Sequence, residues 1–193
     1  MDFLLEDNIR RCLAQRPRRV IKDTNFRRAA VLVPLFETDG EVHILFTKRS
    51  DSVEHHKGQV SFPGGGQDPE DRDLLVTALR ETEEEIGLDA SEVRVLGRLD
   101  DYITISNYMV SPFVGIIPYP VEFNVSDFEI DEVFSVAVPK LLDEDNFHMV
   151  IETKGGHARP QYFFRAEPHV IWGITGRILY QLLDVCLREH YLR

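Results

Sequence analysis

The stretch from Phe62 to Leu88, FPGGGQDPEDRDLLVTALRETEEEIGL, constrains the fold of this chain more than any other. Its three consecutive glycines, Gly64 to Gly66, are costly in a regular helix or strand, so we expect a loop there. A helical pattern follows, which Asp68-Pro69 or Asp71 is predicted to cap and Gly87 to end. The sequence therefore predicts a loop–helix–loop unit whose helix has about five turns.

Carboxylates gather on one side of this predicted helix. Because residues three and four apart share a helix face, Glu81, Glu84 and Glu85 point the same way, and Glu83 points elsewhere. A separate stripe is expected to face the core and consists of Leu75, Ala78, Leu79, Thr82 and Ile86. Like charges one turn apart repel, and a hard divalent cation such as Mg²⁺ relieves that repulsion. The alternative is a solvated acidic surface.

The residues PGGG and RETEEEIGL resemble the Nudix box, the signature of hydrolases that cleave nucleoside diphosphates linked to another group. The positions that match in register are Gly66, Arg80, Glu81, Glu84, Glu85, Gly87 and Leu88. Thr82 stands where an apolar residue is usual. Arg72 stands where the first Glu is expected, with Asp71 beside it as a candidate substitute. The resemblance implies an α/β fold, the Nudix α/β/α sandwich with a mixed sheet, whose catalytic loop–helix–loop covers residues 66–88.

Two further segments are similar to the coenzyme A pyrophosphatase subfamily of that family. The segment Leu45 to Gly65 resembles its upstream motif, and Ile171 to Leu179 resembles a segment near its C-terminus. The agreeing residues upstream are Leu45, Thr47, Arg49, Ser50, Gly58, Phe62, Pro63, Gly64 and Gly65. Glu54 stands where the subfamily tends to carry Arg. The subfamily often has an acid one place before the standard Glu position, which suits Asp71.

The resemblance implies an activity and leaves alternatives open. The activity is Mg²⁺- or Mn²⁺-dependent hydrolysis of coenzyme A or its thioesters to 3′,5′-ADP and the (acyl-)4′-phosphopantetheine. One alternative is a Nudix pyrophosphatase that acts on ADP-ribose or on NADH-type dinucleotides. Another is a non-catalytic, nucleotide-sensing Nudix-like domain. The intact trio Glu81, Glu84 and Glu85 disfavours the non-catalytic reading, whereas Glu54 and Arg72 keep it open.

Site residues follow from the helix and from the resemblance. Glu81, Glu84 and Glu85 are the expected metal ligands, and Arg80 is expected to orient them. The general base is open between Glu81 and Glu132, with Glu129 as a further candidate. Substrate contacts are expected from Arg49, Lys57, Gly64 and Gly65. We expect the remaining candidates to be loop residues or substrate neighbours (His55, His56) and core aromatics (Tyr162, Phe163, Phe164, Trp172).

Length, composition and charge limit the kinds of protein that this chain can be. With 193 residues, 43% of them hydrophobic, the chain suits a single domain over 1–193. A formal net charge of −11 argues against a nucleic-acid surface. The two cysteines, Cys12 and Cys186, are expected to be structural thiols in a reducing compartment. The sequence shows neither a signal peptide nor an apolar run of the ~18 residues that a membrane span needs. We therefore expect a cytoplasmic, soluble protein, and a homodimer stays open.

The rest of the chain supplies the other elements of the predicted sandwich. We expect an N-terminal helix over about residues 2–15 and then a solvated Arg-rich connector. Hairpins are predicted over Ala29–Arg49, turning at Asp39-Gly40, and over Phe147–Ala166, turning at Gly155-Gly156. The other predicted elements are strands in 92–104 and 109–118, a strand passing into a helix in 133–143, and a C-terminal helix with Ile174, Ile178, Leu182 and Val185 on one stripe.

Overall fold

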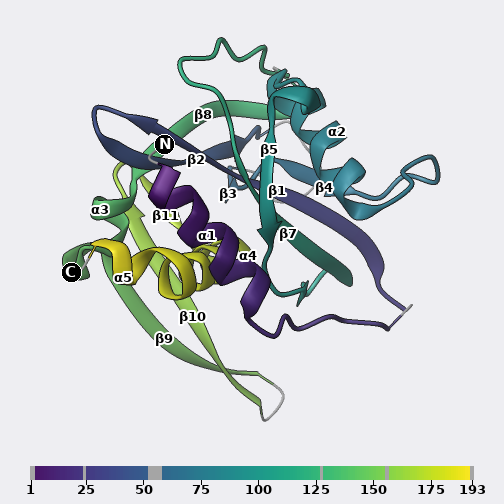
Figure 1. Cartoon of the computed structure of the whole chain (residues 1–193). Coiled ribbons are helices and arrows are strands. Elements are labelled where there is room, and N and C mark those ends of the chain that lie inside the picture. Colours follow the sequence, from purple (N-terminus) through teal and green to yellow (C-terminus); the bar gives the residue numbers. More distant parts are fainter. Residues whose placement is uncertain (1–2, 24, 52–57, 127, 155–156, 192–193) are drawn as a thin grey trace.

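A mixed β-sheet forms the centre of the computed structural model, which describes residues 3–23, 25–51, 58–126, 128–154 and 157–191 (Figure 1). Strand β1 (Arg27–Thr38) pairs antiparallel with β2 (Glu41–Arg49) and parallel with β7 (Tyr108–Ile116). Asp39 and Gly40 both have positive φ, 53° and 78°, between β1 and β2. Two such residues suit a two-residue hairpin turn, so the first predicted hairpin is confirmed.

Shorter strands complete this sheet. Strands β3 (Val60–Ser61) and β8 (Ile130–Ala137) pair with β2, and β4 (Gly64–Gly66) pairs with β1. Strands β5 (Arg94–Arg98) and β6 (Tyr102–Ile103) pair with β7. A second, antiparallel sheet contains β9 (Phe147–Lys154), β10 (His157–Ala166) and β11 (His169–Ile171). Lys154 is opposite His157 in the register, so the second hairpin is also where the sequence predicts it, with residues 155–156 outside the described part.

Helices cover both faces of the main sheet. Helix α2 (Leu74–Ile86) packs on one face against Ala30, Leu32, Met109 and Phe113. The core on the other face contains α1 (Phe3–Gln15), α4 (Gly173–Leu182) and the three-stranded sheet (Figure 1). The remaining helical segments are η1 (Ala90–Glu92), α3 (Val138–Leu142), η2 (Glu144–Asn146), η3 (Leu183–Leu187) and α5 (Arg188–Tyr191). The α/β/α sandwich predicted from the sequence is confirmed.

Helix α2 is shorter than predicted and has a different cap. It contains 13 residues, and Asp73 is its N-cap, accepting hydrogen bonds from the N–H groups of Leu75 and Val76. The predicted caps Asp68 and Asp71 are wrong, because the Asp71 carboxylate accepts hydrogen bonds from Arg80 instead. Gly87 ends the helix with a φ of 71°, as predicted.

The glycine run is a strand, so the predicted loop is wrong. Gly64, Gly65 and Gly66 pair antiparallel with Val31, Ala30 and Ala29 of β1. At Gly64, where φ is 150°, an added Cβ would lie 2.6 Å from the Cα of Val31. The missing side chains thus allow a closer approach than any other residue would, and the backbone pairing offsets the entropic cost of glycine.

Two other expectations hold in part. The Arg-rich connector is largely exposed, as predicted, but it is anchored where Arg16 pairs with Asp100 at 2.7 Å and Arg18 with Asp101 at 2.9 Å. Among the predicted core aromatics Phe164 is buried, whereas Trp172 is 47% exposed because it lies at the end of β11. Within the described residues, no helix is long and apolar enough to span a membrane.

Candidate active site

The glycine strand β4 lies directly against the carboxylates of α2. The Gly64 N–H donates a hydrogen bond of 3.1 Å to Oε2 of Glu85. An added Cβ at Gly65 would collide with the Glu81 carboxylate, whereas one at Gly66 would meet nothing within 4 Å. Backbone and carboxylates therefore approach each other here as closely as the chain permits, and Gly65 is the position that sets this distance.

Helix α2 is rotated slightly from the predicted phase, so that Glu85 is buried. The buried residues of the helix are Leu74, Thr77, Ala78, Thr82, Glu85 and Ile86, and the predicted Leu75 and Leu79 are only partly buried. Glu85 is 1% exposed. Burial raises its pKa to about 8, and the charges of Glu81 and Glu129 add to that rise. The Gly64 N–H and Arg49, whose Nη1 lies 3.2 Å from Oε1, oppose it.

Arg80 connects the other carboxylates through one guanidinium group. Its Nε and Nη2 donate to the two oxygens of Asp71 at 3.1 and 3.0 Å, and Nη2 also donates to the Gly66 carbonyl. Glu81 pairs with the same group at 3.0 Å and Glu84 at 2.8 Å. The bidentate pair holds the pKa of Asp71 at about 2 and raises that of Arg80. Asp71 is therefore ionised and orients Arg80.

Asp71, rather than Arg72, reaches the cluster. Its carboxylate is almost fully buried, whereas the Arg72 side chain is 81% exposed and pairs only with Asp73, at 3.5 Å. Asp71, one position before the standard Glu position of the Nudix box, thus makes the contact with Arg80. Arg72, which occupies that standard position, faces solvent. The sequence contains the signal for this, because the resemblance already named Asp71 as a substitute.

The three expected metal ligands lie at different depths. Glu85 is buried, the Glu81 side chain is 18% exposed and that of Glu84 is 60% exposed. Among the described residues no group of three or more His, Cys, Asp or Glu side chains is arranged to hold a metal. Oxygens of Glu84 and Glu85 instead contact Arg80, Arg49 and the Gly64 N–H. The donors themselves fit Mg²⁺ or Mn²⁺, which prefer carboxylate oxygen. Burial, opposed by Arg80, raises the pKa of Glu81, so added positive charge would be favourable there.

The general-base candidates differ in what surrounds them. Glu132 lies opposite Lys48 in the β2–β8 pairing, and its carboxylate is 3.2 Å from Nε2 of His169. Glu129, just before β8, is the residue whose charge raises the pKa of both Glu81 and Glu85. Its carbonyl accepts a 2.8 Å hydrogen bond from the Ser50 N–H, which anchors this segment beside β2. Lys57, Glu54, His55 and His56 lie outside the described residues.

A helix that carries several glutamates against a glycine strand, beside two arginines, offers donors suited to a divalent cation and to phosphate oxygens. A NUDIX domain family model matches residues 26–150 of this chain. The chain belongs to the Nudix family and is a Nudix diphosphatase. Nudix hydrolases act on small nucleotide-derived substrates and generally need divalent cations such as Mg²⁺ or Mn²⁺.

Relatives and solved structures agree with this assignment. The chain is 36% identical over 166 residues to an uncharacterized Nudix hydrolase NudL of Photorhabdus laumondii, covering 86% of this chain and 88% of the relative. It is 39% identical over 156 residues to NudL of Yersinia pestis, covering 81% of this chain and 78% of the relative. A MutT/nudix family protein from Enterococcus faecalis has the same fold, with a TM-score of 0.57 at 11% identity over 95% of this chain and 74% of that one. A NUDIX hydrolase from Alicyclobacillus acidocaldarius also has this fold. Its TM-score is 0.51 at 23% identity, and the match covers 62% of this chain and 82% of that one.

The contact between Gly65 and Glu81 predicts a matched pair of variants. Gly65→Ala places a methyl group against the Glu81 carboxylate. This clash forces the carboxylate to move away, and the flexible Glu81 side chain allows it to do so. We expect affinity for Mn²⁺, measured by titration, to fall about tenfold or more. Gly66→Ala is the control, since its Cβ meets nothing within 4 Å. Equal effects of the two substitutions would show that the packing on Glu81 is unimportant.

The raised pKa of Glu85 predicts a pH-dependent stability of the metal-free protein. The pKa of this carboxyl is about 8 in the folded state and near the ordinary glutamate value of 4.5 in the unfolded state. Between these values the folded state holds a proton that the unfolded state has lost, so the free energy of unfolding falls as pH rises. The contribution of Glu85 to the free energy of unfolding is complete below about pH 4.5 and is lost progressively as the pH rises to about 8. Urea unfolding across this range checks it. Glu85→Gln should flatten the slope, and the exposed Glu83→Gln should keep it.

Proposed function

We propose that this diphosphatase hydrolyses coenzyme A or its thioesters to 3′,5′-ADP and the (acyl-)4′-phosphopantetheine. The observation that carries the catalytic class is the contact of Glu81 and Glu85 with the glycine strand. The choice of coenzyme A is supported by the two segments that resemble the coenzyme A pyrophosphatase subfamily, Leu45–Gly65 and Ile171–Leu179.

Packing between these two segments adds support to the choice of substrate. The Thr175 hydroxyl, in the C-terminal segment, donates a 3.1 Å hydrogen bond to the carbonyl of Val60 in the upstream segment. Thr175 and Ile171 are both buried. Residues about 115 positions apart in sequence are thus joined beside β3, which leads directly into the glycine strand. Two motifs that share one location favour a common role near the catalytic carboxylates.

The mechanism that we propose assigns a role to each residue of the cluster. Glu81, Glu84 and Glu85 would hold Mg²⁺ or Mn²⁺, with Arg80 positioned by Asp71 to orient them. A bound divalent ion lowers the pKa of the attacking water and stabilises the charge of the leaving oxygen. Arg49, next to Glu85, presents a guanidinium group suited to a phosphate oxygen. Gly64, Gly65 and Lys57 stay predicted substrate contacts.

The residue that removes the proton from water must lie beside the carboxylates. Glu129 is charge-coupled to Glu81 and Glu85, whereas the carboxylate of Glu132 is bonded to His169. We therefore favour Glu129 as the general base, with Glu81 and Glu132 as the other candidates. Proton removal by a positioned carboxylate contributes about 100-fold or more to such reactions.

The remaining predictions concern location and assembly. Cys12 and Cys186 are both free thiols, and the cytoplasmic location stays a prediction. The proposed partner is a small-molecule nucleotide substrate. The homodimer stays a prediction, and light scattering of the purified protein measures it directly.

Replacement of one glutamate tests the catalytic role of the cluster. With coenzyme A and Mg²⁺ we expect release of 3′,5′-ADP, measured by chromatography, and no release when EDTA removes the ion. Glu84→Gln should lower kcat at least about 100-fold, because it removes a ligand charge. Glu83→Gln is the matched control, since Glu83 is exposed and directed away from the cluster. Activity that survives both EDTA and Glu84→Gln would contradict the metal role.

The same assay separates the candidate substrates. Coenzyme A, ADP-ribose and NADH are compared at equal concentration by their kcat/KM values. Faster turnover of ADP-ribose or NADH would contradict the coenzyme A proposal while leaving the diphosphatase class intact. Binding of a nucleotide without any turnover would instead favour the nucleotide-sensing alternative.

Substitution of the two later carboxylates tests the general base. Glu129→Gln should lower kcat by about 100-fold or more and remove the acidic limb of the pH–rate profile. Glu132→Gln should lower it far less, because that carboxylate contacts His169. The reverse order would assign the base to Glu132. A pH profile that neither substitution alters would leave Glu81 as the base.

A further inference from the structure

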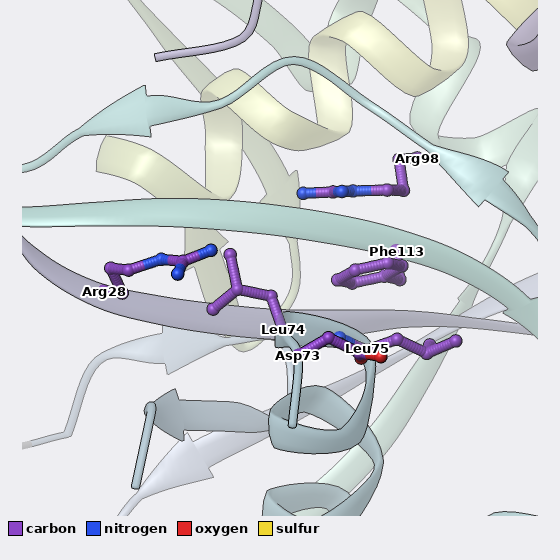
Figure 2. Close-up of a pocket in the computed structure, with 6 residues that line it drawn as sticks. All are labelled: Arg28, Asp73, Leu74, Leu75, Arg98 and Phe113. Atoms are coloured by element: carbon purple, nitrogen blue, oxygen red, sulfur yellow. The ribbon is translucent and has the colours of Figure 1, made fainter. Parts of the chain in front are cut away.

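Two adjoining cavities lie at the other end of α2 from the carboxylates. They have volumes of about 330 and 430 Å³ and share Arg28, Leu74 and Arg98 in their walls (Figure 2). These volumes are at the lower end of those of small-molecule sites. Asp73 also lines the first cavity. It lies eight positions before Glu81, which corresponds to a rise of about 12 Å along the helix. The cavities are therefore separate from the proposed catalytic cluster.

Two arginines from different strands face this space. Figure 2 shows the guanidinium groups of Arg28, on β1, and Arg98, on β5, extending toward the same region above Leu74. The Arg98 group lies 4.6 Å from the centre of the Phe113 ring. Its Nη2 donates to the Ser111 hydroxyl at 3.0 Å, but its buried Nε has no hydrogen-bond partner among the residues that the structure describes. Stacking on Phe113 holds the group in place while leaving donor capacity unused.

The positive charge of these arginines is poorly compensated. Within the described ranges, the Arg28 side chain makes neither a hydrogen bond nor an ion pair. Buried Asp101 lies 3.8 Å from Arg98, but its oxygens already bind Arg18 at 2.9 Å, the Ser111 hydroxyl at 2.6 Å and the Ile21 N–H at 3.0 Å. Burial lowers the pKa of Arg98, the charges of Arg18 and Arg28 lower it further, and the charges of Asp101 and Asp73 oppose this shift.

Two N–H groups at the helix end already have an acceptor, because the N–H groups of Leu75 and Val76 donate to the Asp73 carboxylate. The arginines are therefore the main charged donors available to an anionic ligand. The walls combine apolar side chains (Val20, Ile21, Phe26, Leu74, Leu75, Met109, Phe113) with polar and charged ones (Arg18, Lys22, Asp23, Asp73, Asp101, Ser111). Such walls are more extensive than a bare oxyanion needs, and they suit a ligand with an apolar part.

We propose that these cavities bind a small phosphomonoester, with the phosphate group between Arg28 and Arg98 and an apolar or aromatic body against Leu74 and Leu75. Guanidinium groups form paired hydrogen bonds with phosphate oxygens, and two of them match a dianion. The proposal is independent of which diphosphate the enzyme cleaves.

Calorimetric titration of the full chain tests this site. The probes are phenyl phosphate and inorganic phosphate, with EDTA present so that metal-dependent binding at the carboxylates does not contribute. We expect saturable binding with phenyl phosphate bound more tightly. Arg28→Gln should weaken phenyl phosphate binding by about tenfold, the loss of a charge-assisted hydrogen bond. Arg28 is exposed, so this variant should fold.

Two matched variants complete the experiment. Arg165→Gln removes the same charge from an exposed residue of β10 and should leave binding unchanged. Glu81→Gln should also leave it unchanged, because Glu81 is remote from the cavity. Absence of saturable binding at millimolar phenyl phosphate, or equal weakening by Arg28→Gln and Arg165→Gln, would overturn the proposal. Loss of binding in Glu81→Gln would also overturn it. Inorganic phosphate that binds as tightly as phenyl phosphate would overturn it too, because it would indicate an adventitious ion only.

Discussion

The bidentate pair between Arg80 and Asp71 is the interaction on which the carboxylate cluster depends. Asp71 precedes α2 and Gly66 ends β4, and the Arg80 guanidinium bonds to both while it pairs with Glu81. One side chain thus joins the strand, the connecting segment and the helix. A buried ion pair costs desolvation energy unless its hydrogen bonds are satisfied. Here the fork of Arg80 meets several oxygens at once, so its charge is well compensated.

Two carboxylates near this pair have opposite environments. Asp71 has a pKa of about 2 because it binds Arg80 directly. Glu85 has a pKa of about 8 because it is buried, with two other glutamates adding negative charge. Arg49 and Arg80 neutralise the cluster only in part. The fold therefore fixes one carboxylate permanently as an anion and leaves another whose ionised form needs further positive charge, which is the electrostatic condition for binding a cation.

Local patterns predicted most of the fold, and contacts distant in sequence account for what they missed. The turn at Asp39-Gly40 and the helix end at Gly87 depend on short-range conformational preferences, and both were predicted correctly. The glycine strand was mistaken for a loop because its partner, β1, lies more than thirty residues earlier. The sequence pattern indicates a cap at Asp71 because its actual partner, Arg80, is nine residues away and is reached only in the folded turn. The burial of Glu85 likewise depends on the position of β4.

The charge distribution along α2 opposes the helix dipole at both ends. Its first turn holds no acidic residue and its last turn no basic one, although acids at the N-terminus and bases at the C-terminus would be stabilising. Glutamates crowd the C-terminal half instead, and Arg28 and Arg98 approach the N-terminal end. The capping carboxylate of Asp73 and the carboxylate of Asp101 offset the latter in part. A helix charged in this way is stabilised by a cation at one end and an anion at the other. The same electrostatic argument therefore connects the catalytic cluster to the arginine-lined cavities.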